Sequence, residues 1–342
     1  MISKISNDFP VFDFKKDARY LGFFDFSCPE GPIFSWSGCS IQTNFNGTGI
    51  YAKIIDKNMT GNSWISVIID YKESDPINIK PDKDMYVIAK GLKNEAHNLE
   101  IHKRTEALLG QLQFCGFELS SGGRFLTPPS EKARKIEIIG DSITCGAGNE
   151  GVYSGDDAEF LGKEENNYMS YGPIAARILD ADIAMVSISG SGCYQNYGGA
   201  KENTIGDLYL KTNLSTSYDE WNLKKWTPDV VVVNLGTNDF SAEIDTDKFK
   251  EKYKRLIKHI RNKYSKAAIF CSIGPMNLQP GKYIDSVVNE LKIEGDSSIF
   301  YCEFDPIDLK DEGLGWGTHP TIKTHEKMAK KLANEIKLRL CW

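Results

Sequence analysis

A serine and a histidine, far apart along the chain, are of the types that form a catalytic nucleophile and its base. Ser142 lies in the run Gly-Asp-Ser-Ile-Thr-Cys-Gly, directly after the apolar stretch 135–139. A serine at a strand end, beside glycine, can present its hydroxyl and its backbone N–H to a cleft. His319, in Gly-Thr-His-Pro, stands on a loop just ahead of a helical pattern. Asp-Ser after a strand is also a common turn or helix cap, so Ser142 alone is weak evidence.

Two further runs offer hydrogen-bond donors at strand ends. Ser-Gly-Ser-Gly (189–192) follows the apolar stretch 182–188, and Gly-Thr-Asn-Asp (236–239) follows 230–235. Glycine lets a backbone N–H approach a ligand, and an asparagine amide can donate to an oxyanion. Ligands bind outside the carboxyl ends of the strands in open parallel sheets. We therefore expect these donors and Ser142 to converge on one sheet edge.

The elements that must position these residues fall into two halves. From Tyr20 to about Glu118, short β-rich runs alternate with turn residues at roughly ten-residue spacing, which indicates an all-β sandwich or jelly roll. Leu-Thr-Pro-Pro-Ser (126–130) then interrupts any regular element. We predict a β-sandwich domain over residues 1–130 and a catalytic domain over 131–342.

The second half has the rhythm of an α/β fold. Continuous apolar strands alternate with amphipathic helical patterns, the clearest of which cover 245–264 and 321–340. This alternation predicts a parallel sheet covered on both faces, that is, a three-layer α/β/α domain. The expected strands are 135–139, 182–188, 230–235, 267–273 and 299–304.

Taken together and in this order, the Gly-Asp-Ser, Ser-Gly, Gly-Thr-Asn-Asp and His-Pro runs resemble the blocks of the SGNH (GDSL) hydrolase superfamily. The run HKRTEA (102–107), the run 136–148 and the N-terminal β domain are similar to carbohydrate esterase family two. This resemblance implies an acetyl xylan esterase-like serine esterase that removes O-acetyl groups from plant polysaccharides or oligosaccharides. It implies Ser142 as nucleophile and His319 as general base.

The same resemblance implies an oxyanion hole. Its donors are the backbone N–H of Ser142, the backbone N–H of Gly190 and the side-chain amide of Asn238. We favour Gly190 over Gly192 for the second donor.

One position departs from the superfamily pattern. Members with a full triad have an aspartate three residues before the histidine, where this chain has Trp316. Either a backbone carbonyl near 315–317 orients His319, or an acid such as Asp311 does so from elsewhere. Four other histidines have ordinary interpretations as exposed or core residues: His97, His102, His259 and His325.

Aromatic residues near the presumed cleft are candidates for stacking on a sugar ring. For Tyr194 and Tyr197 core packing is an equally good interpretation, whereas Trp316, in a glycine-rich loop beside His319, favours substrate binding. Lys103, Arg104 and Glu106 are better interpreted as a strand-surface or interdomain charge ladder than as substrate contacts.

Charge and composition exclude several partners. A net charge of -6 argues against a broad grip on nucleic acid or anionic membrane. No stretch has the length of a membrane span and the N-terminal residues do not read as an export signal, so we expect a cytoplasmic protein, or a secreted one whose signal peptide is missing from this sequence. Eight singly scattered cysteines favour reduced thiols. We expect no cofactor or metal, and the sequence leaves the oligomeric state open.

Two rival interpretations remain. A lipid or thioester hydrolase on the same sheet would need a broad apolar groove, whereas these loops are rich in Gly, Asn, Tyr and Asp. A non-catalytic carbohydrate-binding protein is disfavoured by the intact serine, histidine, glycine and asparagine. The run 146–151 satisfies GxGxxG, but no helix opens at its glycines, so we do not expect a dinucleotide site.

Overall fold

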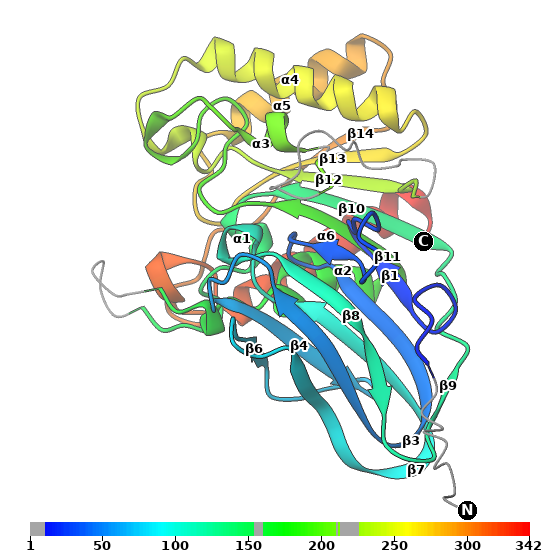
Figure 1. Ribbon diagram of the computed structural model, residues 1–342. Helices are drawn as coiled ribbons and strands as arrows, with labels where there is room; N and C mark the ends of the chain where they lie inside the picture. The colour runs from blue at the N-terminus through cyan, green and yellow to red at the C-terminus, as the bar shows by residue number, and fades with distance from the viewer. Residues whose placement is uncertain (1–10, 154–159, 210, 213–225) are drawn as a thin grey trace, which may run out of the picture.

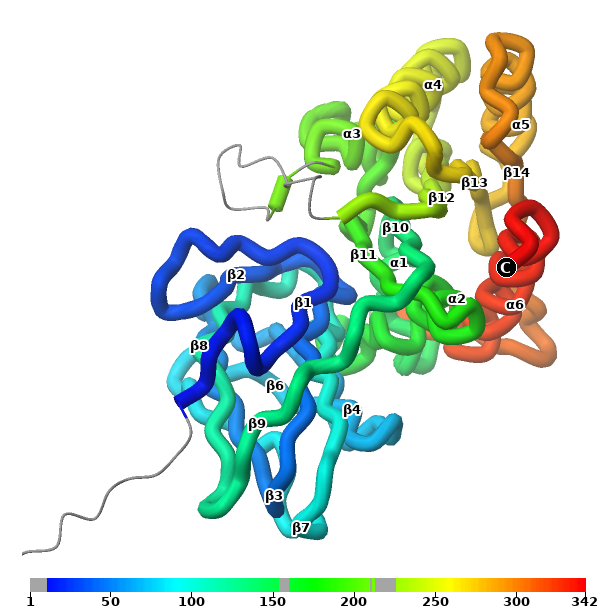
Figure 2. Tube along the Cα trace, turned by 90° about the vertical axis from the view of Figure 1, so that its right-hand side faces the viewer, coloured from blue at the N-terminus to red at the C-terminus, as the bar shows by residue number. Residues whose placement is uncertain are grey.

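The structure, a computed structural model, describes residues 11–153, 160–209, 211–212 and 226–342 of the chain. An antiparallel β domain is followed by an α/β domain, and the two pack side by side (Figures 1 and 2). Residues 1–10, on which the expectation about an export signal rests, lie outside the described part. Within that part, no helix combines the length and the apolar character needed to cross a membrane.

The β domain is a nine-stranded antiparallel sheet in which strands β2-β8-β3-β7-β4-β5 lie in that order. Its strands are β1 (Arg19–Leu21), β2 (Ile33–Phe34), β3 (Ser40–Asp56), β4 (Ser63–Ile69), β5 (Lys72–Glu73), β6 (Ile77–Ile79), β7 (Met85–Lys103), β8 (Leu112–Leu119) and β9 (Arg124–Leu126). The all-β prediction is confirmed.

The expected spacing of short strands does not hold for β3 and β7, which are 17 and 19 residues long. In the structure the pairing of β3 with β7 shifts register between Gly47 and Gly49. The segment from Gly47 to Gly49 therefore forms a bulge, and the strand continues beyond it.

The α/β domain has a five-stranded parallel sheet in the order β11-β10-β12-β13-β14. These strands are β10 (Arg134–Gly140), β11 (Ala181–Ser187), β12 (Val230–Asn234), β13 (Ala268–Ile273) and β14 (Ile299–Glu303). The helices are α1 (Ser142–Cys145), α2 (Tyr171–Ile178), α3 (Ile205–Leu208), α4 (Thr246–Lys263), α5 (Gly281–Ile293) and α6 (Ile322–Leu340). The predicted parallel sheet is confirmed.

Successive residues of the central strand β12 point to opposite faces of the sheet and pack in two different apolar cores. Val230 and Val232 pack with residues of α2 and α6, whereas Val231 and Val233 pack with residues of α4 and α5. The sheet is therefore buried on both faces, which gives three layers. The core that contains Val231 and Val233 continues into the β domain, where it includes Trp36. The two domains thus share one apolar core across their interface.

One carboxyl group lies in the middle of the parallel sheet. Glu137 of β10 is fully buried and accepts hydrogen bonds from the phenols of Tyr209 at 2.7 Å and Tyr264 at 2.8 Å. Burial raises its pKa to about 7, and the two phenols oppose that rise. A group of this kind inside the sheet was not expected from the apolar reading of the strand.

Candidate active site

Strand register brings the predicted runs together. Gly140 at the end of β10 pairs with Ser187 at the end of β11 and with Asn234 at the end of β12. The loops that carry Ser142, Gly190 and Asn238 therefore leave the sheet at the same edge, as expected from parallel pairing.

Ser142 and His319 meet at this edge. The Ser142 Oγ lies 2.9 Å from Nε2 of His319. Ser142 opens the short helix α1, whose preceding residue Asp141 accepts the Ile143 N–H through its side chain. This cap fixes the turn that aims the serine hydroxyl at the imidazole. The contact has the geometry of a nucleophile and its base.

A backbone carbonyl orients His319. The carbonyl oxygen of Trp316 lies 3.1 Å from Nδ1 of His319, which fixes the tautomer with the proton on Nδ1 and leaves Nε2 free to accept from Ser142. Asp311 is exposed, and its backbone N–H bonds to Asp308 nearby in the same loop. Of the two orienting groups considered from the sequence, the structure therefore provides the carbonyl.

The environment of His319 keeps the imidazole neutral. Burial lowers the pKa of His319 from its usual 6.5, and the carbonyls of Trp316 and Gly317 oppose part of that shift. A neutral imidazole is the form that can take a proton from Ser142.

Two glycines of the GxGxxG run, Gly148 and Gly151, pack directly against the turn that carries Trp316. The Trp316 N–H donates to the carbonyl of Gly148 at 3.0 Å. A Cβ on Gly148 would lie 2.9 Å from the Trp316 Cβ, and one on Gly151 would lie 2.8 Å from it. These glycines permit the close approach of two backbones, so the run supports the histidine loop and does not form a dinucleotide site.

The structure favours Gly190 over Gly192 as the backbone donor. Gly190 has φ +74° and lines the pocket beside Ser142. The N–H of Gly192 already donates to Oδ1 of Asn196 at 3.0 Å. Gly192 is also absent from the lining of this pocket, so Gly190 fits better.

Asn238 is held in place by partners that the sequence did not suggest. Its side-chain nitrogen donates to the carbonyl of Ser191 at 3.0 Å and to Oδ2 of Asp141 at 3.2 Å. Asp141 is fully buried, and burial raises its pKa to about 7. The bond to Asp141 is the longer and therefore the weaker of the two. The N–H that makes it is the one that Asn238 would donate to an oxyanion beside it.

Asp239 is a structural anchor that sequence reasoning missed. Its carboxylate accepts three backbone N–H groups, from Cys193 at 2.9 Å, Tyr194 at 2.6 Å and Gln195 at 3.0 Å. The loop after β12 is thereby tied to the loop after β11. Its position directly after Asn238 in Gly-Thr-Asn-Asp was the only signal that could have revealed it.

A pocket of about 670 Å³ opens over the dyad. Trp316 and Tyr197 lie in its wall, and Tyr197 is 73% exposed. The ring of Phe160 packs against that of Trp316, with the centroids 4.7 Å apart and the planes tilted by 55°. Tyr194 lies elsewhere: it is 8% exposed and belongs to the apolar core. The structure therefore corrects the placement of Tyr194, because the bonds to Asp239 turn this segment inward.

Of the two positions considered for the charged run before the pocket, a strand surface or the domain interface, the structure shows the interface. Lys103, Arg104 and Glu106 are 0%, 1% and 4% exposed, so they are not on a strand surface. They lie between the two domains, and Glu106 lines the pocket. The β domain thus contributes directly to the pocket wall.

Three side chains beside the pocket have donor atoms close enough to hold a metal ion. The ligand atoms of Glu106, Cys145 and Glu165 all lie within 4.8 Å of one another. Burial raises the pKa of Glu106 and raises that of Glu165 well above its usual value, and the nearby charge of Lys103 opposes part of each rise.

The geometry defines a serine hydrolase, in which a histidine takes the proton of the attacking serine. Comparison with known families agrees: residues 136–332 match the GDSL-like lipase/acylhydrolase family, and residues 20–129 match the carbohydrate esterase 2 N-terminal domain. The chain belongs to the GDSL-like hydrolases and, among them, to the family two carbohydrate esterases.

Individual relatives carry consistent names. The chain is 43% identical over 329 residues to the cellulase/esterase CelE of Acetivibrio thermocellus, an alignment that covers 94% of this chain and 39% of CelE. It is 29% identical to an acetylxylan esterase/glucomannan deacetylase of Cellvibrio japonicus, with 90% and 86% covered. A family two carbohydrate esterase from Clostridium thermocellum, solved in complex with cellohexaose, superposes with a TM-score of 0.89 at 42% identity, covering 95% of this chain and 99% of that one.

Proposed function

We propose that this protein removes O-acetyl groups from plant polysaccharides or oligosaccharides through an acyl-enzyme on Ser142. The observation that carries the proposal is the 2.9 Å contact between Ser142 Oγ and His319 Nε2 at the floor of a pocket walled by Trp316 and Tyr197. The names of the relatives support an acetylated carbohydrate as substrate. Xylan, glucomannan and acetylated hexosides are the candidates.

The reaction follows from the site. His319 Nε2 takes the Ser142 proton as Oγ attacks the acetyl carbonyl carbon. The carbonyl oxygen becomes an oxyanion, and we assign its stabilisation to the N–H groups of Ser142 and Gly190 and the amide of Asn238, three residues that line the pocket. His319 then protonates the sugar oxygen, which leaves as the free hydroxyl. Water, deprotonated by His319, attacks the acetyl-serine and releases acetate.

A direct test measures acetate released from acetylated xylan, glucomannan and acetyl hexosides. We expect release by the wild type and none above background for Ser142→Ala, whose fold is checked by circular dichroism. Release by Ser142→Ala within tenfold of wild type would remove the nucleophile assignment. Comparing acetyl with octanoyl esters of one chromophore separates this function from a lipid hydrolase, for which the octanoyl ester would be the better substrate.

A second candidate function is the binding of unesterified β-glucan chains in the same pocket. The observation that favours it is the cellohexaose complex of the similar Clostridium thermocellum esterase. Calorimetric titration of cellohexaose into Ser142→Ala tests it, with Trp316→Ala as the comparison. Binding that is undiminished in Trp316→Ala would place the glucan elsewhere.

We propose a cytoplasmic location, with secretion as the alternative. The support is that all eight cysteines are free thiols, and five of them are buried. Fractionation of the native cells, followed by an antibody to this chain, distinguishes the two.

A further inference from the structure

A carboxylate of the β domain reaches into the backbone that carries the oxyanion donors. Glu106 lies just beyond the end of β7, in the segment that leads into the short turn Ala107–Leu109. Its Oε2 accepts the backbone N–H of Ser189 at 2.8 Å. Ser189 is the residue directly before Gly190, and both line the pocket with Ser142, so this bond anchors the turn that carries the Gly190 N–H.

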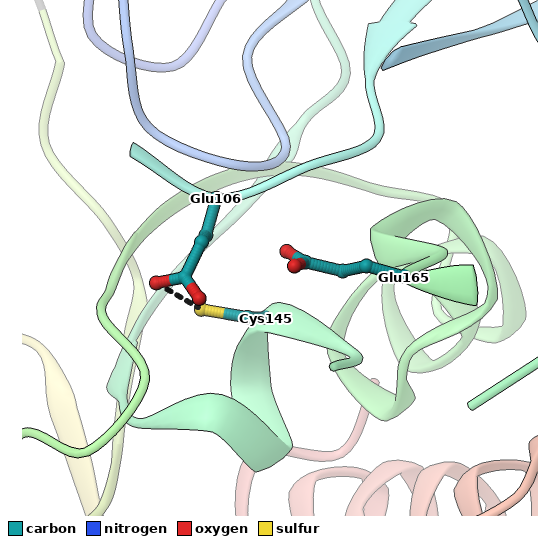
Figure 3. Close-up of side chains that lie close together, drawn as sticks. All are labelled: Glu106, Cys145 and Glu165. Atoms are coloured by element: carbon teal, nitrogen blue, oxygen red, sulfur yellow. Dashed lines mark hydrogen bonds between the residues drawn. The ribbon is translucent and has the colours of Figure 1, made fainter. Parts of the chain in front are cut away.

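The same oxygen also touches the nucleophile's helix. The thiol of Cys145, at the end of α1, lies 3.9 Å from Oε2 of Glu106. Figure 3 shows the side chains of Glu106, Cys145 and Glu165 directed toward one another, with the Glu106 carboxylate beside the Cys145 sulfur. One carboxylate therefore contacts both segments that supply backbone donors: α1, which begins at Ser142, and the Ser189-Gly190 turn.

Glu106 is itself held firmly. The ammonium of Lys103 donates to the backbone carbonyls of Thr105 at 2.6 Å and Glu106 at 3.1 Å. Arg104 bonds to Glu150 and to the carbonyl of Lys163, and so ties the same segment to the loop before Glu165. The segment is buried from end to end, which leaves the Glu106 side chain little freedom to leave the turn.

The bond ties the β domain to a turn that is also held within the α/β domain, where the Gly190 carbonyl accepts the Tyr197 N–H at 2.8 Å and the Ser191 carbonyl accepts from Asn238 at 3.0 Å. Gly190 takes φ +74°, and the neighbouring Ser191 N–H is held by the carbonyl of Ile188 at 3.2 Å. Without the Glu106 acceptor, the Ser189 N–H would have to find another partner, because a buried donor left unpaired is unfavourable. A peptide that rotates to find one would carry the adjoining Gly190 N–H out of line.

We propose that Glu106 is a positioning residue for the esterase reaction, which sets the Gly190 N–H in the oxyanion hole by accepting the N–H of Ser189. The role belongs to its oxygen as an acceptor and not to its negative charge. The β domain is in this way a working part of the catalytic site. The inference rests on the proposed esterase function.

Two substitutions at Glu106 and one matched control test the proposal. Glu106→Gln keeps an acceptor oxygen, whereas Glu106→Ala removes the acceptor. Asp182→Asn is the control: Asp182 is also a buried carboxylate at the domain interface, bound to Arg19 and to the Lys132 N–H, away from the turn.

The expected result is a split between kcat and KM. Glu106→Ala should lose about 10- to 100-fold in kcat with KM within about threefold, since a fully lost oxyanion donor costs ~10²–10³. Glu106→Gln should stay within about threefold of wild type, and Asp182→Asn should lower Tm without lowering kcat. Wild-type kcat in Glu106→Ala, equal losses in Gln and Ala, or a similar kcat loss in Asp182→Asn would each overturn the proposal.

Amide hydrogen exchange provides a readout that does not depend on the substrate. The peptide that spans Ser187–Gly192 should exchange faster in Glu106→Ala than in wild type and remain protected in Glu106→Gln. Unchanged protection in Glu106→Ala would refute the positioning role even if the protein hydrolysed no acetyl ester. Absence of esterase activity in the wild type would instead remove the proposed function alone.

Discussion

The carbonyl oxygen of Trp316 accepts the Nδ1 proton of His319 at 3.1 Å, in the place where a triad would have a carboxylate. The imidazole is therefore oriented by the backbone of its own loop. That loop is in turn held by Gly148, whose carbonyl accepts the Trp316 N–H, and by Gly315, whose N–H donates to the carbonyl of His319 at 2.9 Å.

We predict first that no acidic side chain is needed to orient the base. Asp311→Asn should retain activity within roughly tenfold, whereas His319→Ala should lose on the order of 10³ or more. The reason is that a backbone carbonyl cannot be removed by changing an acid. Steady-state rates on an acetyl ester decide this, and a loss in Asp311→Asn as large as that in His319→Ala would restore a displaced triad.

A second prediction concerns the acid side of the pH profile. His319 must be neutral to act as base, and its burial lowers its pKa below the usual 6.5. Activity should therefore persist to lower pH than an ordinary histidine would allow, with the acid midpoint of kcat/KM below 6.5. The ring resonances of His319 in Ser142→Ala should titrate in the same range. A midpoint above 6.5 in both measurements would contradict the stated environment.

Third, activity should be sensitive to one methyl group added at Gly148, where this residue packs against the Trp316 turn. In Gly148→Ala the new Cβ would lie 2.9 Å from the Cβ and the carbonyl oxygen of Trp316, so the loop must move and His319 with it. We expect kcat to fall about 10- to 100-fold, since small misplacements near a catalytic group carry losses of that order. Gly122→Ala is the matched control, because Gly122 also has positive φ, +79°, but has open space around it. Equal activity of the two variants would refute the packing argument.

A fourth prediction separates the three aromatic candidates for sugar contact by the effect of their substitution on KM and Tm. Trp316→Ala and Tyr197→Ala should raise KM for acetylated oligosaccharides by about tenfold each, because each removes a pocket surface on which a sugar ring can stack. Tyr194→Ala should instead lower Tm and leave KM unchanged, since Tyr194 packs in the core. The Michaelis constants and melting temperatures of the three variants test this division. A raised KM in Tyr194→Ala would return that residue to the pocket.

A fifth prediction follows from Glu137. Its folded pKa of about 7 lies above the usual 4.5, so the folded state holds a proton that the unfolded chain has lost. Its contribution to stability is complete below about pH 4.5 and is lost as the pH rises through 7, by on the order of 3 kcal/mol. Glu137→Gln should therefore flatten the decline in unfolding free energy between pH 5 and pH 7.5, measured with urea. Parallel profiles for both proteins would contradict this.

Much of the catalytic architecture could be predicted from the sequence because each run sits directly after its own strand. Ser142, Gly190 and Asn238 follow three neighbouring strands, and parallel pairing brings such positions to one edge without further information. His319 was recognisable because a proline and a helix begin directly after it. The carbonyl of Trp316 could be named as one of two options, but only the loop's conformation chooses between them.

What could not be predicted depends on contacts between distant segments. The sequence left Lys103, Arg104 and Glu106 either on a strand surface or between the domains, and only the packing of the second domain, which buries them, decides between the two. The sequence gives no reason to separate Tyr194 from Tyr197 as a sugar contact. The separation depends on Asp239, which accepts the Tyr194 N–H and holds this residue in the core. Glu137 is invisible within an apolar strand because its partners, Tyr209 and Tyr264, lie far along the chain.

The buried segment that carries Glu106 also bears on how such enzymes can be engineered. Because this segment lines the pocket and shares an apolar core with the α/β half, the β half is not an accessory module to be exchanged at the proline-rich junction. A chimaera joined near Pro128 would bring a foreign side chain into the reaction centre. Grafts between related enzymes should therefore transplant Lys103–Glu106 together with the loops it meets, or keep both halves from one parent.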